Sequence, residues 1–113
     1  MYKINGNIWI ETENKIFVSE NQAILLREIS KTGSITKASR AMKISYRHAW
    51  ELIDSINSLS EKPVVIALTG GRGGGGTKLT SYGENIIRLF NKTHKQFLSF
   101  AKKQSEKIKS SSL

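Results

Sequence analysis

The chain has 113 residues, a formal net charge of +9 and no cysteine. That length suffices for one domain that buries roughly two thirds of its unfolded surface, and the lack of cysteine excludes disulfides, thiolate metal sites and cysteine nucleophiles. The excess of positive charge favours a polyanionic partner, although a run of charges is more often only a solvated surface.

The first residues, MYKINGNIWIETEN, lack the basic region and apolar run of a signal peptide. No later run is apolar and long enough for a membrane span, so the sequence predicts a cytoplasmic protein with no membrane partner. Alternating apolar residues around Ile8 and Ile10, with turn residues between apolar stretches, predict a hairpin over residues 1–18.

A first helix of about three turns is expected after this hairpin. Ser19 and Gln22 have the spacing of a capping box, and apolar residues including Leu25 and Ile29 supply a buried face. Gly33 is expected to end the helix.

Residues 34–59 are predicted to form a helix-turn-helix. Ile35, Ala38 and Met42 repeat at helical spacing over barely two turns, and Lys43 and Ile44 form a break. Ser45 can cap a second helix whose apolar face runs from Ala49 through Leu59. The stretch from Ile29 to Trp50 contains five basic residues and no acidic one until Glu51, which makes the start of this second helix basic.

A second hairpin is predicted over residues 64–80, followed by a helix over residues 81–109. The run VVIAL from Val64 is β-branched and apolar, TKLT from Thr77 alternates, and six of the nine glycines lie between these two strands. Ser81 and Glu84 form a candidate capping box for the last helix. The sequence thus predicts a single domain, mainly α with small β hairpins, in a winged helix-turn-helix arrangement.

The glycine run admits two interpretations. It lacks the GK[ST] ending of a phosphate-binding loop, and no helix follows it directly. Glycines let a wing loop approach a sugar-phosphate backbone, and Arg72 is the only long side chain in the run, which favours contact with DNA at Arg72, Gly73 and Gly74. The alternative is a hairpin tip that is merely flexible.

The helix-turn-helix supplies the other candidate DNA contacts. Arg47 is the best candidate for reading a base, since a guanidinium can donate two hydrogen bonds to guanine. Its alternative role is a surface ion pair with Glu51, and Tyr46 is expected to anchor the helix together with Trp50 rather than to stack on a ligand. The full set of candidates outside the glycine run is Thr36, Lys37, Arg40, Lys43, Ser45, Tyr46, Arg47, His48, Glu51 and Lys78.

These segments resemble the winged-helix DNA-binding domain of molybdate-responsive, ModE-type transcription regulators and, more distantly, LysR-type regulators. The similar stretches are GSITKASRAMKISYRHAWELIDSINSLS from Gly33 and TGGRGGGGTKLTSYGENII from Thr69. The resemblance implies transcription regulation by a homodimer on double-stranded DNA, with the first and last helices pairing the subunits. The apolar residues expected at that dimer interface are Leu25, Ile29, Ile86, Phe90, Phe97 and Phe100; packing of the last helix on the first is their alternative role.

Members of that family continue into a molybdate-binding region, whereas this sequence ends soon after the predicted wing. We therefore expect no molybdate site, no other cofactor and no metal in these residues, which leaves abundance or a separate effector-sensing protein as routes of regulation. An enzyme is not expected, because no cluster of acids, histidines or cysteines accompanies the glycine loop. A nucleotide-binding protein and a protein-interaction module remain the alternatives to a DNA-binding regulator.

Overall fold

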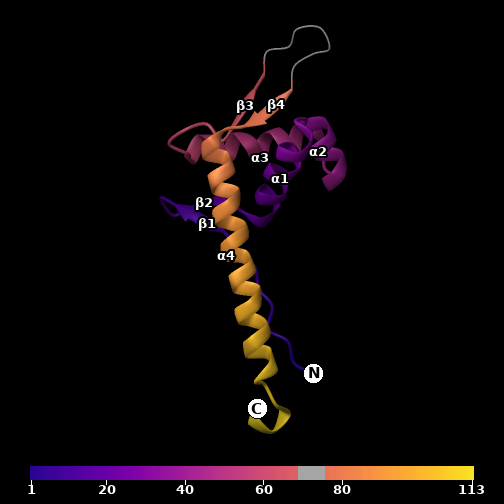
Figure 1. Cartoon of the computed structure of the whole chain (residues 1–113), viewed down its shortest axis with the longest axis vertical. Coiled ribbons are helices and arrows are strands. Elements are labelled where there is room, and N and C mark those ends of the chain that lie inside the picture. The colour runs from indigo at the N-terminus through magenta and orange to yellow at the C-terminus, as the bar shows by residue number, and fades with distance from the viewer. Residues whose placement is uncertain (69–75) are drawn as a thin grey trace.

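The computed structural model describes residues 1–68 and 76–113, and within them the fold is mainly helical with two small antiparallel hairpins (Figure 1). This confirms the predicted fold class, and the arrangement is that of a winged helix-turn-helix. In chain order the elements are β1 (Ile10–Thr12), β2 (Lys15–Val18), α1 (Glu20–Thr32), α2 (Ile35–Met42), α3 (Tyr46–Leu59), β3 (Val65–Ala67), β4 (Thr77–Leu79), α4 (Ser81–Glu106) and a short 3-10 turn (Ser110–Ser112).

The first hairpin is shorter than predicted. Its strands pair Thr12 with Lys15, and the turn residues Glu13 and Asn14 both have positive φ angles, 51° and 63°, as a two-residue hairpin turn requires. Residues before Ile10 form no strand. The first of them run instead beside the distal half of α4, where the backbone amide of Ile4 donates to Ser105 Oγ at 2.8 Å (Figure 1).

Helix α1 begins and ends as predicted. The Ser19 side chain accepts a hydrogen bond from the Gln22 backbone amide, and the Gln22 side chain accepts one from the Ser19 amide, which completes the capping box. At the other end Gly33 adopts the left-handed conformation, with φ 66° and ψ 20°.

The predicted cap of the last helix was wrong by one residue. Thr80, not Ser81, caps α4, since its Oγ1 accepts from the Gly83 amide at 3.0 Å. The same hydroxyl donates to the Pro63 carbonyl at 2.7 Å, a tertiary contact that Ser81 does not make. Helix α4 ends at Glu106, three residues before the predicted boundary.

The hydrophobic core lies around α1, which contacts α2, α3, α4 and β4. Its largest fully buried side chains come from β2, α1, α3 and the residue before β3: Val18, Leu25, Leu26, Ile29, Ile53, Ile56 and Val64. The first turns of α4 close this core, and the rest of α4 extends away from it, which gives the molecule its length of 66 Å (Figure 1).

Candidate nucleic-acid interface

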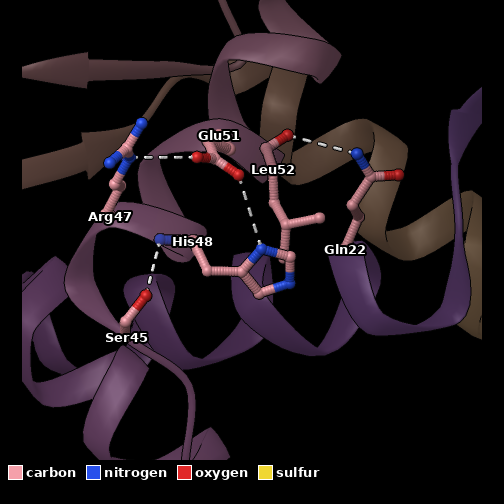
Figure 2. Close-up of polar contacts among 6 residues, drawn as sticks. All are labelled: Gln22, Ser45, Arg47, His48, Glu51 and Leu52. Carbon is pink, nitrogen blue, oxygen red and sulfur yellow. Dashed lines mark hydrogen bonds and ion pairs between the residues drawn. The ribbon is translucent and has the colours of Figure 1, made fainter.

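The helix-turn-helix is built from two capped helices and a tight break. Ser34 caps α2 by accepting from the Lys37 amide at 3.1 Å, and Ser45 caps α3 by accepting from the His48 amide at 3.0 Å (Figure 2). Between them Lys43 takes a left-handed conformation, with φ 58°, which turns the chain sharply enough for α3 to cross α2. The break predicted at Lys43 and Ile44 is confirmed.

The start of α3 presents a polar cluster to solvent (Figure 2). Glu51 lies between two basic partners: Arg47 Nε is 3.3 Å from Glu51 Oε1, and His48 Nδ1 is 3.7 Å from Glu51 Oε2. The Arg47 side chain is 91% exposed and that of Glu51 is 60% exposed. A surface pair of this kind contributes only about 0.2–0.5 kcal/mol, so Arg47 can leave Glu51 at little cost.

The two aromatic residues at the edge of α3 differ in burial. Trp50 is half-buried and packs against the core, as expected of an anchoring residue. Tyr46 is 54% exposed and meets the Trp50 ring edge to face, with centroids 6.3 Å apart. Tyr46 is therefore more accessible than its predicted anchoring role requires.

Most of the candidate DNA contacts are described by the structure, and all of these are exposed: Thr36, Lys37, Arg40, Lys43, Ser45, Tyr46, Arg47, His48, Glu51 and Lys78. They come from α2, the break, the first turns of α3, and β4. The candidates in the glycine run, Arg72, Gly73 and Gly74, lie outside the described residues.

The wing is a two-stranded antiparallel hairpin. It pairs Val65 with Leu79, Ile66 with Lys78, and Ala67 with Thr77, and its strands fall inside the predicted range. Leu79 is buried and Lys78 is exposed, so the strand alternates between the core and solvent. The Lys78 side chain therefore lies on the solvent face of the wing.

Asn57 joins the end of α3 to the wing, a role that sequence reasoning missed. Its Oδ1 accepts from the backbone amides of Val64 at 2.8 Å and Val65 at 3.4 Å, and its Nδ2 donates to the Val65 carbonyl at 3.1 Å. The only signal in the sequence was a polar residue beside Ile56, on the buried side of the helix. One side chain thus fixes where β3 starts relative to α3.

The opposite strand of the wing is fixed to the turn before α2. The Thr77 amide donates to the Gly33 carbonyl at 3.0 Å. A Cβ added at Gly76 would lie 2.7 Å from that carbonyl oxygen, so only glycine fits this approach. The base of the wing and the start of the helix-turn-helix are therefore in direct backbone contact.

Gln22 connects α1 to α3. Besides its part in the capping box, its Nε2 donates to the Leu52 carbonyl at 3.1 Å, and the residue is only 4% exposed (Figure 2). A buried amide that makes both bonds fixes the position of α3 on α1. The capping role was predicted, but the contact with α3 was not.

The candidate interface residues of the predicted dimer fall into two groups. Leu25, Ile29, Ile86 and Phe90 lie in the core of this chain, at most 8% exposed, so they do not form a surface that a second subunit reaches. Their alternative role, packing within the chain, is the observed one. Phe97 is half-buried, and Phe100 is 60% exposed.

Membrane spans and metal clusters are both absent from the described part of the chain. None of its helices is long and apolar enough to cross a membrane. No group of three or more histidine, cysteine, aspartate or glutamate side chains lies close enough to hold a metal ion in residues 1–68 and 76–113.

Comparison with known proteins identifies relatives named ModE. The chain is 34% identical to the molybdenum transport protein ModE of Azotobacter vinelandii over 99 residues, which is 88% of this chain and 37% of that protein. It is 40% identical to the transcriptional regulator ModE of Yersinia pestis and 39% identical to the DNA-binding transcriptional dual regulator ModE of Escherichia coli, each over 82 residues, 73% of this chain and 31% of the relative.

The chain therefore spans about a third of the length of the curated relatives it matches. No family model matches it. The predicted resemblance to the N-terminal part of ModE-type regulators is confirmed, whereas the more distant resemblance to LysR-type regulators stays a prediction.

Proposed function

Because the chain is a relative of the N-terminal part of ModE transcriptional regulators, we propose that it binds double-stranded DNA and regulates transcription in the cytoplasm. One observation carries the proposal: every described candidate DNA contact is exposed, and together they follow α2, the start of α3 and the wing. The charged side chains among them are basic except for Glu51, which pairs with Arg47.

The proposed mechanism places the start of α3 in the major groove. The groove admits one α-helix, and side chains in its first turns reach base edges. Arg47 exchanges its weak pair with Glu51 for two hydrogen bonds to a guanine. Lys37, Arg40 and Lys43 contact phosphates on either side, and the wing, with Lys78 and Arg72, lies against the neighbouring backbone.

Two other classes of function make different predictions. A nucleotide-binding enzyme would bind a mononucleotide and ignore duplex DNA, and a protein-interaction module would bind neither. Binding of a random duplex and of a mononucleotide to the purified chain therefore separates the three classes. Absence of any duplex binding at low salt would contradict the proposal.

Arg47→Ala is expected to weaken binding to the best DNA site by about 1–3 kcal/mol and to relax base preference at one position of each half-site. Arg47 is the only arginine in the described first turns of α3. Its substitution by alanine therefore removes the proposed base contact as well as a charge. Selection of DNA sites from a random pool, followed by affinity measurement, checks both effects.

Lys103→Ala is the matched control, since it removes one positive charge from the distal part of α4, far from the wing (Figure 1). It should leave base preference unchanged. Arg72→Ala should weaken specific and random duplexes about equally, because a backbone contact carries no sequence information. If Arg47→Ala and the native chain prefer the same bases at every position, Arg47 does not contact a base.

The proposal includes a homodimer, formed through the part of α4 that the core leaves uncovered. Leu89 is 57% exposed and Phe100 is 60% exposed. They lie about three turns apart on one face of α4, since each residue advances the helix by about 100°. Two copies that pair these faces would cover both side chains and present two recognition helices, as a palindromic operator requires.

Leu89→Glu with Phe100→Glu is expected to convert a dimer into a monomer at tens of micromolar in sedimentation experiments. Two carboxylates on a shared apolar seam would have to lose their hydration upon pairing. Ser99→Glu is the control, because it adds a carboxylate to an exposed position of α4 on another face. A monomeric native chain, both free and on DNA, would refute the dimer.

A further inference from the structure

A row of exposed basic side chains follows one face of α4, and we call it the basic stripe. It consists of Arg88, Lys92, Lys95 and Lys102. Since each residue advances the helix by about 100°, these four positions fall within about 80° of one another, on a strip about 21 Å long. Helix α4 leads away from the wing (Figure 1), and the proposed DNA contacts of α2, α3 and the wing do not use the stripe.

No acidic residue balances the stripe along the helix. Between Glu84 and Glu106, α4 contains five basic residues and no acidic one. None of the four stripe residues forms an ion pair within residues 1–68 and 76–113. Like charges at spacings of three and four residues destabilise a helix slightly, and such departures from local stability are typical of surfaces that bind something.

The other proposed and observed contacts of α4 leave the stripe uncovered. Leu89 and Phe100, the proposed dimer residues, lie about 100° or more around the helix from the centre of the stripe. The N-terminal segment lies on the opposite side of α4, where Gly6 packs against the Phe97 ring. The stripe therefore stays accessible in a dimer that pairs through Leu89 and Phe100.

The composition of the stripe favours a nucleic acid over a protein or a membrane. Lysine is depleted at protein interfaces, which are enriched in aromatic residues and methionine, and the stripe has neither. A helix that lies on a membrane needs a continuous apolar face, whereas Phe90 and Ala101 of α4 are buried in this chain. Duplex DNA is bound without base contacts by lysine and arginine alone, and the stripe is as long as about six base-pair steps of about 3.4 Å.

We infer that the basic stripe binds the phosphate backbone of a second duplex DNA segment, without base preference. Binding at the stripe requires nothing from the helix-turn-helix. Bridging does rest on the proposed function, because there one molecule holds an operator at α3 and a second segment at α4. Such a protein joins two distant sites on one DNA molecule, or two separate duplexes.

Recruitment of a second duplex tests the bridging. A short duplex that carries the best site is fixed on beads and loaded with the native chain, and a labelled random duplex is then added. The loaded beads are expected to retain the labelled duplex. Its affinity should fall by about two decades between about 50 and about 200 mM salt, if each of the four cations meets one phosphate.

The stripe variant, Lys95→Gln with Lys102→Gln, should lower the affinity for the labelled duplex about tenfold or more and bind the fixed site as the native chain does. Lys15→Gln with Lys107→Gln is the matched control, because it removes the same charge from exposed positions outside the stripe. Ser99→Glu adds a carboxylate to an exposed position within the stripe and should also weaken recruitment.

A chain with weakened helix-turn-helix contacts, Lys37→Ala with Arg47→Ala, separates this inference from the proposed function. If it still binds random duplex, and adding the two stripe substitutions weakens that binding, the stripe is supported even where no operator is bound. The inference is wrong if the native chain binds its site but retains no second duplex, or if the stripe variant and its control retain it equally.

Vesicles that contain anionic lipid provide the last comparison. If the stripe variant loses binding to these vesicles but not to duplex DNA, the stripe serves a membrane and the inference is overturned. Thermal unfolding at or above the native Tm shows that the variants remain folded, since they remove like-charge repulsion from the helix.

Discussion

The affinity for duplex DNA is expected to fall by about three decades or more when salt rises from about 50 to about 200 mM, if each subunit of a dimer neutralises about three to five phosphates. Each neutralised phosphate releases a condensed counterion, and added salt opposes that release. The exposed basic residues of α2, the break and β4 supply the charges: Lys37, Arg40, Lys43 and Lys78.

The slope of log affinity against log salt is measured by fluorescence anisotropy with a labelled duplex. Lys37→Ala should reduce that slope by about one per subunit, whereas Lys103→Ala at the distal part of α4 should leave it unchanged. A flat salt profile of the native chain would rule out a phosphate-binding surface.

Gly83→Ala is expected to lower the free energy of unfolding by about 2–3 kcal/mol, although alanine is the better helix former by about 1 kcal/mol. A Cβ at this position would lie 2.4 Å from the Val64 carbonyl oxygen and 2.5 Å from Leu79 Cδ2. The carbonyl cannot move freely, because it accepts from the Thr80 amide at 3.0 Å. The added methyl group must therefore separate α4 from the wing.

Thermal unfolding measures the effect, and a loss of this size lowers Tm by roughly 10 °C for a chain of this length. Ser99→Ala, on an exposed face of the same helix, should change stability by less than about 0.5 kcal/mol. Equal or greater stability of Gly83→Ala would contradict the close packing of α4 against the wing.

Local chemistry was enough to predict most helix boundaries. The capping box of Ser19 and Gln22, the left-handed Gly33 and the Ser45 cap all act within a few residues, so their spacing in the sequence is informative. The cap of α4 was missed because Thr80 and Ser81 are adjacent residues with equivalent hydroxyls. Only the tertiary bond from Thr80 to the Pro63 carbonyl distinguishes them.

Long-range contacts were harder to predict. The alternation around Ile8 indicates a strand, yet that segment has no strand beside it, and Ile8 instead packs against the core. Of the predicted dimer residues, Leu25 and Phe90 are buried in the core of the chain itself. The spacing of apolar residues along a helix is the same for a face that packs in the core and for one that pairs with a second subunit, so the sequence could not distinguish the two. The roles of Asn57 and Gly83 depend on segments that meet only in the folded chain.

The contacts of Asn57 bear on how binding specificity could be transferred between proteins of this architecture. A graft that replaces only the exposed first turns of α3 keeps Asn57 and its three bonds to the residues at the start of β3. A graft of the whole helix from a protein without asparagine at this position would remove these bonds and release the strand from the helix end. The segment to exchange is therefore either the first half of the helix, from Ser45 to Leu52, or the continuous segment from Ser45 to Val65. A graft boundary between Asn57 and Val64 would separate Asn57 from the backbone groups that it binds.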